Sequence, residues 1–408
     1  MSFQQGLSGL NAAAKSLDVI GNNVANSSTV GFKQSQAQFA DVYANSLTGA
    51  GGSNVGIGTK VSQVTQQFTQ GNITSTNNPL DMAINGGGFF RMDTGGEITY
   101  QRNGQFQLDK SGYIVNPTGA KLTGYMANAN GVLAVGAPSP IMINTSDLVP
   151  NITTDVTAVL NLDSGSAPIN VATSPFNMSD PTTFHNSTAV SVYDSLGNAQ
   201  TLQTYYVKRP SGDWDVYAAN DGAQIGAGPI ATLSFNTSGA LTTAMPLAAI
   251  NVPATATGAT SPFPVTFDFT GTTQFGSSFS VNTLDQNGYT SGRLAGFNVG
   301  SDGMVLGRYT NGQSAVLGQV VLANFSNPNG LQQMGNNMWS ESSTSGSPLV
   351  GTPNSGSLGV LQSSAVEDSN VDLTAELVNM ITAQRVYQAN AQTIKTQDAV
   401  MQTLVNLR

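Results

Sequence analysis

Residues 370–408 read NVDLTAELVNMITAQRVYQANAQTIKTQDAVMQTLVNLR and contain neither glycine nor proline. One column of apolar residues recurs every seven positions, and it comprises Val366, Leu373, Met380, Tyr387, Ile394 and Met401. A second column, offset by four, holds Leu377, Ala391 and Val405 but is interrupted by Gln384 and Asp398. This spacing predicts an amphipathic helix over 371–407, about 55 Å long, with Asn370 or Asp372 as its N-cap.

The opposite end of the chain carries a matching pattern. Apolar and small residues alternate by steps of four and three, at Phe3, Leu7, Leu10, Ala14, Leu17, Gly21 and Val24. This predicts a second helix, which we expect to end near Gly21 and the Asn22-Asn23 pair because these residues weaken helices. A single antiparallel pair covers only part of the two stripes. Two interpretations therefore remain: an ordinary core within one chain, or helices covered by further copies of the chain.

Between about residues 75 and 350 the sequence is typical of short strands and turns. Hairpin turns are predicted at Asn103-Gly104, Ser111-Gly112, Gly197-Asn198 and 210–212. Similar turn sequences occur in DQNGY, GSDGM and YTNGQ. We expect antiparallel strands in two packed units. Residues 220–265, rich in Ala, Thr, Gly and Pro, are predicted to be loops, and SLTGAGGSNVGIGTK (46–60) a flexible linker.

The composition and motifs argue against most classes of catalytic, metal-binding and nucleic-acid-binding site. Charged residues make up 9% of the 408, against roughly a quarter in an average soluble protein. A net charge of −9 without a basic run argues against nucleic acid, and the absence of cysteine excludes disulfides and thiolates. His185 is the only histidine, so His-cluster metal sites and His-based triads are not expected. The Gly-rich stretches 51–60 and 85–90 lack a Gly-Lys-Ser/Thr motif or a following helix, so neither is read as a phosphate loop.

We therefore expect no enzyme activity, no catalytic residues, no cofactor and no metal. Carboxylates scattered among turns leave a glycosidase-like pair open, at Asp163, Asp180, Asp194, Asp213 and Asp215. No run of 18 apolar residues occurs, so no membrane insertion is expected. The first residues lack a basic n-region and a continuous apolar h-region, so we expect no cleaved signal peptide.

Four blocks in order resemble the bacterial flagellar axial proteins, the rod and hook families. NNVANSSTVGFK (22–33) is similar to their N-terminal signature and 370–408 to their C-terminal one. FTQGNITSTNNPLDMAINGGGFF (68–90) and YQRNGQFQLDKSGYIVN (100–116) resemble their shared inner block, with Gln101 where the family usually has Thr. The matching motif positions are Asn23, Asn26, Gly31, Phe32, Asn370, Asp372 and Leu373. GYTSGRLAGF (288–297), RYTNGQSAVLGQVVLANFSNPNGL (308–331) and the large middle insertion are similar to hook subunits in particular; the resemblance is weakest over 147–284.

The resemblance implies an α+β, multidomain chain with two mainly antiparallel β-domains nested between paired, coiled-coil-like terminal helices. The implied parts are a helical inner domain (1–33 with 363–408), a connecting segment (34–70 with 357–362), an inner β-domain (71–146 with 285–356) and an outer β-domain (147–284). It also implies helical self-assembly into a short curved flexible tube around an export channel. That tube would be a universal joint carrying torque from rod to filament, in the extracellular part of the flagellum.

The resemblance also implies which residues meet other copies. The expected subunit-interface residues are Phe3, Leu7, Leu10, Leu17, Val24, Leu373, Leu377, Met380, Tyr387, Ile394 and Met401. The expected partners are the chain itself, a distal rod protein, a hook cap protein, a hook–filament junction protein, a hook-length control protein and the flagellar export apparatus. Two alternatives are kept: a distal rod protein, and a secreted β-rich adhesin or carbohydrate-binding protein.

Overall fold

The structure, a computed structural model, describes residues 2–42, 56, 58–128, 131–255 and 258–406. The chain divides into two compact units. The first is drawn from residues 1–144, 296–307 and 315–408, and the second from 145–295 and 308–314. Both ends of the chain therefore belong to one unit. Within the described ranges no helix is long and apolar enough to span a membrane.

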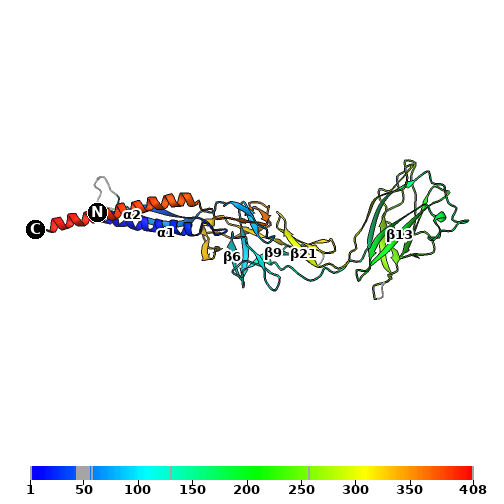
Figure 1. Cartoon of the computed structure of the whole chain (residues 1–408), viewed down its shortest axis with the longest axis horizontal. Helices are drawn as coiled ribbons and strands as arrows, with labels where there is room; N and C mark the ends of the chain where they lie inside the picture. Colours follow the sequence, from blue (N-terminus) through cyan, green and yellow to red (C-terminus); the bar gives the residue numbers. More distant parts are fainter. Residues whose placement is uncertain (1, 43–55, 57, 129–130, 256–257, 407–408) are drawn as a thin grey trace. The chain divides into compact units, whose positions relative to one another are not determined.

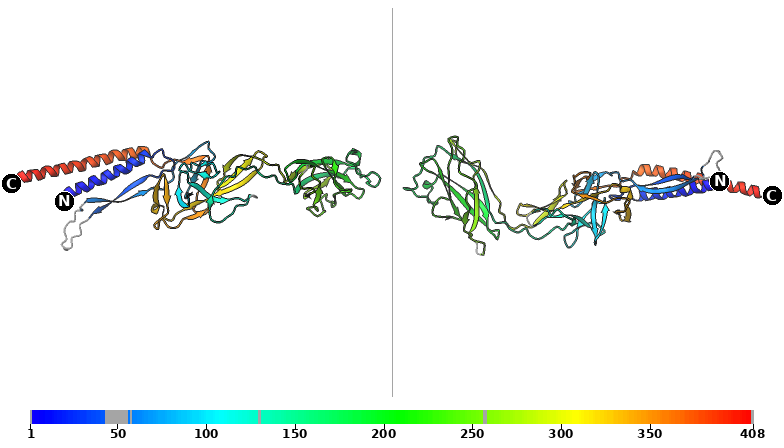
Figure 2. Two further views of the ribbon diagram at one scale, coloured as in Figure 1. Left: turned by 90° about the horizontal axis from the view of Figure 1, so that it is seen from below. Right: turned by 180° about the vertical axis from the view of Figure 1, so that it is seen from behind.

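The two predicted helices are present in the first unit. Helices α1 (Ser2–Ala25) and α2 (Leu373–Asn406) run antiparallel, side by side (Figures 1 and 2). The side chain of Asp372 accepts hydrogen bonds from the backbone N–H groups of Thr374 (2.9 Å) and Ala375 (3.1 Å), which confirms it as the N-cap. Extending the helical stripe back to Val366 was wrong. That residue is buried in strand β29 (Ala365–Glu367), which pairs with β3 (Ile73–Ser75) ahead of the cap.

A two-stranded ribbon runs along α1. Its strands β1 (Ser35–Val42) and β2 (Gly58–Gln66) are antiparallel. Side chains of α1 bind its far end: Gln5 Nε2 donates to the Gly56 carbonyl (2.7 Å), and Ser8 Oγ accepts from the Thr59 N–H (3.3 Å). Of the predicted linker 46–60, residues 46–55 and 57 lie outside the described residues. Its last residues belong to the ribbon, which β pairing and α1 hold in place.

The rest of the first unit is built on a 13-stranded sheet with the order β21-β22-β23-β9-β5-β6-β26-β25 along its main path. Residues far apart in sequence meet in it, because β5 pairs both with β9 and with β24. An aromatic core of Phe89, Tyr100, Phe325 and Trp339 packs on one part of it. A separate pair joins β4 (Met82–Asn85) to β28 (Val360–Ser363). The sheet strands are β5 (Phe89–Thr94), β6 (Glu97–Gln101), β7 (Gln107–Leu108), β8 (Ile114–Val115), β9 (Lys121–Met126), β10 (Ser139–Pro140), β21 (Leu294–Val299), β22 (Met304–Tyr309), β23 (Ser314–Val320), β24 (Leu322–Asn324), β25 (Gln332–Gly335), β26 (Met338–Ser340) and β27 (Leu349–Gly351).

The predicted turns in this unit had mixed outcomes. Ser111-Gly112 closes the β7–β8 hairpin, as predicted. Asn103-Gly104 closes no hairpin, because β6 pairs with β5 and β26 instead. The Gly104 carbonyl accepts from the Met82 N–H (2.9 Å), and a Cβ on Gly104 would lie 1.6 Å from the Met82 carbonyl oxygen. This glycine therefore permits a close approach of two backbones.

The second unit contains two five-stranded sheets around one core that includes Leu160, Trp214 and Phe263. The turns at Gly197-Asn198 and 210–212 join β12–β13 and β13–β14 as predicted. The expectation of loops over 220–265 was wrong in part, since three short strands and the start of β18 lie there. The first sheet holds β11 (Asp155–Asp163), β17 (Ile250–Val252), β18 (Phe263–Asp268), β19 (Thr273–Phe275) and β20 (Ser280–Gln286); the second holds β12 (Asn186–Tyr193), β13 (Ala199–Lys208), β14 (Trp214–Asn220), β15 (Ala223–Gln224) and β16 (Ala231–Leu233). The α+β, multidomain fold class, with mainly antiparallel strands, is confirmed.

Candidate functional site

The α1–α2 contact is made by small residues. Gly6 and Gly9 of α1 lie so close to α2 that an added Cβ would be 3.2 Å from Ile394 Cγ1 and 2.8 Å from Asn390 Oδ1 respectively. Ala13 on α1 and Ala383 on α2 are both buried. Small side chains allow the two backbones to approach closely, but they bury little apolar surface.

The predicted apolar stripes lie on the flank of this contact. Positions 376, 383 and 390 of α2 face α1, and the column 380, 387, 394 is turned from them by about 40° around the helix. Ile394 is the one predicted residue shown against α1, where it meets Gly6. Six predicted interface residues are between 37% and 61% exposed: Phe3, Leu7, Leu373, Leu377, Tyr387 and Met401. The others are partly buried: Leu10, Leu17, Val24, Met380 and Ile394.

Two asparagines of the predicted motif join the helices to the ribbon. Asn23 is 1% exposed; its Oδ1 accepts from the Ser35 N–H (2.9 Å), and its Nδ2 donates to the Ser35 carbonyl (2.8 Å) and to Glu376 Oε2 (3.3 Å). Asn370 Oδ1 accepts from the Gln34 N–H (2.7 Å), while its Nδ2 donates to the Gln67 carbonyl (2.7 Å). Each position uses both a donor and an acceptor, which the amide of asparagine supplies.

The remaining motif residues have local roles. Gly31 has φ +70°, donates its N–H to the Glu367 carbonyl (2.8 Å), and would bring a Cβ to 2.5 Å from the Asn103 nitrogen. Asn26 Nδ2 donates to the Asn22 carbonyl (3.0 Å) at the end of α1. Phe32 is buried. These residues fix the path of the chain as it leaves α1.

A buried ionic cluster joins three distant segments. The Glu367 carboxylate lies 2.6 Å from Lys33 Nζ and 3.1 Å from Arg102 Nη1, and the three side chains are at most 4% exposed. It also accepts from the Gly71 N–H (2.9 Å). Burial lowers the pKa of Lys33 and of Arg102, against the attraction of Glu367, which favours their charged forms. Sequence reasoning missed the pairing of Arg102 with Glu367, since nothing local to either residue indicates it.

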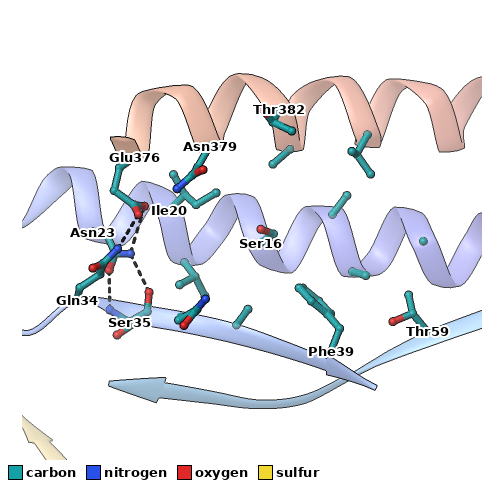
Figure 3. Close-up of a pocket in the computed structure, with 18 of the residues that line it drawn as sticks. Ser16, Ile20, Asn23, Gln34, Ser35, Phe39, Thr59, Glu376, Asn379 and Thr382 are labelled. Carbon is teal, nitrogen blue, oxygen red and sulfur yellow. Dashed lines mark hydrogen bonds between the residues drawn. The ribbon is translucent and has the colours of Figure 1, made fainter. Parts of the chain in front are cut away.

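A groove of about 730 Å³ lies between α1, α2 and the ribbon (Figure 3). Ser16 and Ile20 contribute from α1, Phe39 from β1 and Thr382 from α2. Among the described residues that line it, Glu376 is the one ionisable side chain, and Gln34 Nε2 (2.7 Å) and Asn23 hydrogen-bond to it. These described residues offer no cation for an anionic ligand.

The histidine and the aspartates considered as catalytic candidates form hydrogen bonds or ion pairs within the fold. His185 lies with Nε2 2.6 Å from the Ala167 carbonyl, and its Nδ1 accepts from the Lys208 N–H (3.2 Å). Asp194 accepts from the backbone of its own turn, and Asp215 pairs with Arg209. Among the described residues no group of three or more His, Cys, Asp or Glu could hold a metal ion.

Known families cover both ends and the middle of the chain. Residues 3–33 match the flagella basal body rod protein family, 83–160 the flagellar hook protein FlgE/F/G D1 domain, 161–289 the flagellar basal body protein FlaE D2 domain and 362–407 the flagellar basal body rod FlgEFG protein C-terminal family. Flagellar hook protein FlgE of Salmonella typhimurium is 45% identical over 418 residues, covering all of both chains. This chain belongs to the flagellar hook protein family.

Other hook proteins agree with this assignment. FlgE of Escherichia coli is 45% identical over 417 residues, and FlgE of Borreliella burgdorferi is 32% identical over 454 residues, with all of this chain covered in both cases. The crystal structure of Helicobacter pylori hook protein FlgE2 has a TM-score of 0.57 at 13% identity, covering 72% of this chain and all of that one, which shows a shared fold. The predicted resemblance is confirmed, and these full-length relatives favour the hook over the distal rod.

Proposed function

We propose that this hook-family chain is the self-assembling subunit of the flagellar hook, with its apolar helix stripes as the contact between copies. The observation that carries this proposal is the exposure of Phe3, Leu7, Leu373, Leu377 and Met401 in a protein whose own helices meet through glycine and alanine. Burying a large apolar side chain contributes about 1.5–3 kcal/mol. Several half-exposed side chains per copy therefore provide a substantial driving force for assembly.

The contact joins different patches on each copy and therefore need not close. A heterologous interface of this kind generates an open helical assembly. The tube so formed surrounds an export channel and acts as a universal joint between rod and filament. Its subunits are proposed to comprise a helical part (1–33 with 363–408), a connecting part (34–70 with 357–362), an inner β-domain (71–146 with 285–356) and an outer β-domain (147–284).

The same role implies partners and a route. The chain is a structural component of the hook, and we propose contacts with the distal rod, hook cap, hook–filament junction and hook-length control proteins. We also propose delivery through the flagellar export apparatus, because the hook lies outside the cell. The absence of cysteine suits a chain that travels unfolded, since no disulfide has to form or break.

Charge introduced into the stripe tests the proposal. Leu373→Asp and Tyr387→Asp should abolish sedimentable tubes, seen by electron microscopy, while circular dichroism reports an unchanged β-sheet content. Gln392→Asp, at an exposed polar position of the same helix, is the matched control and should assemble normally. Normal tubes from both stripe variants would contradict the proposed interface. Loss of the β signal as well would assign these residues to the chain's own core.

A further inference from the structure

Helix α2 is longer than its partner helix. It has 34 residues against 24 in α1, and Gly6, near the start of α1, already lies against Ile394. Residues beyond about 398 therefore extend past α1, as Figures 1 and 2 show. We call residues 399–406 the tail of α2; at about 1.5 Å per residue it is about 12 Å long.

Three apolar side chains of the tail are exposed. Val400, Met401 and Val405 are 49%, 61% and 71% exposed. The tail's sequence, AVMQTLVN, has no ionisable side chain. Met401 lies seven residues beyond Ile394, which meets Gly6, and so lies about two helical turns past that contact. This end of α2 therefore needs a partner outside its own helix pair.

The groove between α1, α2 and the ribbon has matching properties. Its walls include two small, partly buried residues that let another backbone approach, Ala12 and Ala37, beside the small residues of the α1–α2 contact. Phe39 and Val386, which are 43% and 47% exposed, offer apolar surface. The one carboxylate, Glu376, is already bound by amide groups, so an uncharged occupant leaves no ion unpaired.

The tail cannot occupy the groove of its own chain. The groove runs beside α2 from Glu376 to Asn390, and α2 continues as one helix away from it. A second copy displaced along the helix axis meets no such obstacle. One groove and one tail per copy then give a contact that repeats without closing.

We propose that the tail of α2 from one copy docks one apolar face into the groove between α1, α2 and the ribbon of the next copy. This inference rests on the proposed function, and it names the segment and the receiving surface for one contact within that assembly. It also assigns the ribbon a role as one wall of the receiving site, with Phe39 as its apolar contact.

The absence of native cysteine permits a direct cross-linking test. Ser16, labelled in the groove in Figure 3, and Met401 in the tail are both changed to cysteine in one chain. Mild oxidation of assembled tubes should give a ladder of covalent multimers, and oxidation of dilute monomer should give none. The matched control pairs Met401→Cys with Asn11→Cys, an exposed position of α1 outside the groove lining, and should give no ladder.

A complementation experiment provides a second measurement. Met401→Asp with Val405→Asp removes the tail's apolar surface, and Ala37→Trp fills the groove. Neither variant alone should form tubes, whereas their mixture should give a discrete 1:1 complex in light scattering. Tubes from either variant, or tubes of the double-cysteine chain that give no ladder, would overturn the tail-and-groove contact while leaving self-assembly intact. Failure of the unmodified chain to form tubes would instead overturn the proposed function.

Discussion

At the scale of single residues, the chain concentrates part of its scarce charge in one buried place. Charged residues are 9% of the sequence, yet Lys33, Arg102 and Glu367 are brought together with almost no exposure. Two cations share the Glu367 carboxylate, which also accepts from the Gly71 N–H, while Lys33 Nζ donates a further hydrogen bond to the Thr69 carbonyl. A buried ion pair is weak evidence for net stability, but removing one member leaves the others without compensation.

Glu367→Gln should therefore destabilise the first unit strongly. The two buried cations lose their counter-charge, for which a loss of about 3–5 kcal/mol is expected. Urea unfolding followed by the fluorescence of Trp339, in a Trp214→Phe background, would measure it. Glu97→Gln, at an exposed glutamate of the same unit, should change stability by less than about 0.5 kcal/mol. Equal effects of the two substitutions would contradict a special role for the cluster.

The buried Tyr100 makes the stability of the first unit depend on pH in the alkaline range. Burial, together with the nearby Glu341 carboxylate that accepts its hydroxyl hydrogen bond (3.2 Å), raises the pKa of Tyr100 to about 12. The folded unit therefore holds this proton more tightly than the unfolded chain does. Its contribution to stability is complete below about pH 10 and is lost as the pH rises toward 12. Tyr100→Phe should flatten this part of the stability–pH curve; the same slope in both proteins would contradict the assignment.

At the scale of elements, the sequence predicted both helices but not the face by which they pair. The predicted seam of α1 alternates between two columns of apolar and small residues, from Phe3 to Val24. In the structure α1 meets α2 through residues outside both columns, because Gly6 and Gly9 admit Ile394 and Asn390 at short distance. Close backbone approach depends on the partner's shape, which periodicity alone does not report.

The strands, too, could be predicted only where their partners are close in the sequence. Local turn signals identified the Ser111-Gly112, Gly197-Asn198 and 210–212 hairpins, whose strands are neighbours in sequence. Pairings such as β5 with β24, and the contact of Gly104 with Met82, depend on distant segments and left no local pattern. For the same reason Glu367 and Arg102 escaped sequence analysis, while the motif asparagines were found through the family resemblance.

The seam predicts different outcomes for two glycines of α1. Gly9→Leu should weaken the helix pair, because its Cβ would lie 2.8 Å from Asn390 Oδ1 and displace that side chain, and the further carbons of leucine overpack the contact at a cost of about 1–3 kcal/mol. Gly21→Leu, in the same helix, has no atom within 4 Å of the added Cβ and should stabilise α1 through helix propensity. Hydrogen exchange of α1 in sedimented tubes should show less protection for the Gly9→Leu protein than for the Gly21→Leu protein. Equal protection in both variants would contradict the small-residue seam.

At the scale of the whole molecule, the two ends of the chain meet in one unit, while several large apolar side chains of their helices, among them Phe3 and Met401, are at least half exposed. The β-sheets of both units have buried cores of their own, whereas the helix pair rests on a seam of small residues and the Asn23–Glu376 network. A surface with few charges can be covered by further copies at little cost in charge desolvation. We therefore propose that the helices are the part of the subunit whose stability depends most on assembly.

Hydrogen exchange of α1 (residues 2–25) and α2 (residues 373–406), in dilute monomer and in sedimented tubes, tests this dependence most directly. Exchange should be fast in these segments of the monomer and slow in the tubes, while the sheet cores around Trp339 and Trp214 stay protected in both samples. Equal and strong protection of the helices in monomer and tubes would mean that one chain alone completes their core. That result would contradict the claim that the apolar stripes are buried between copies.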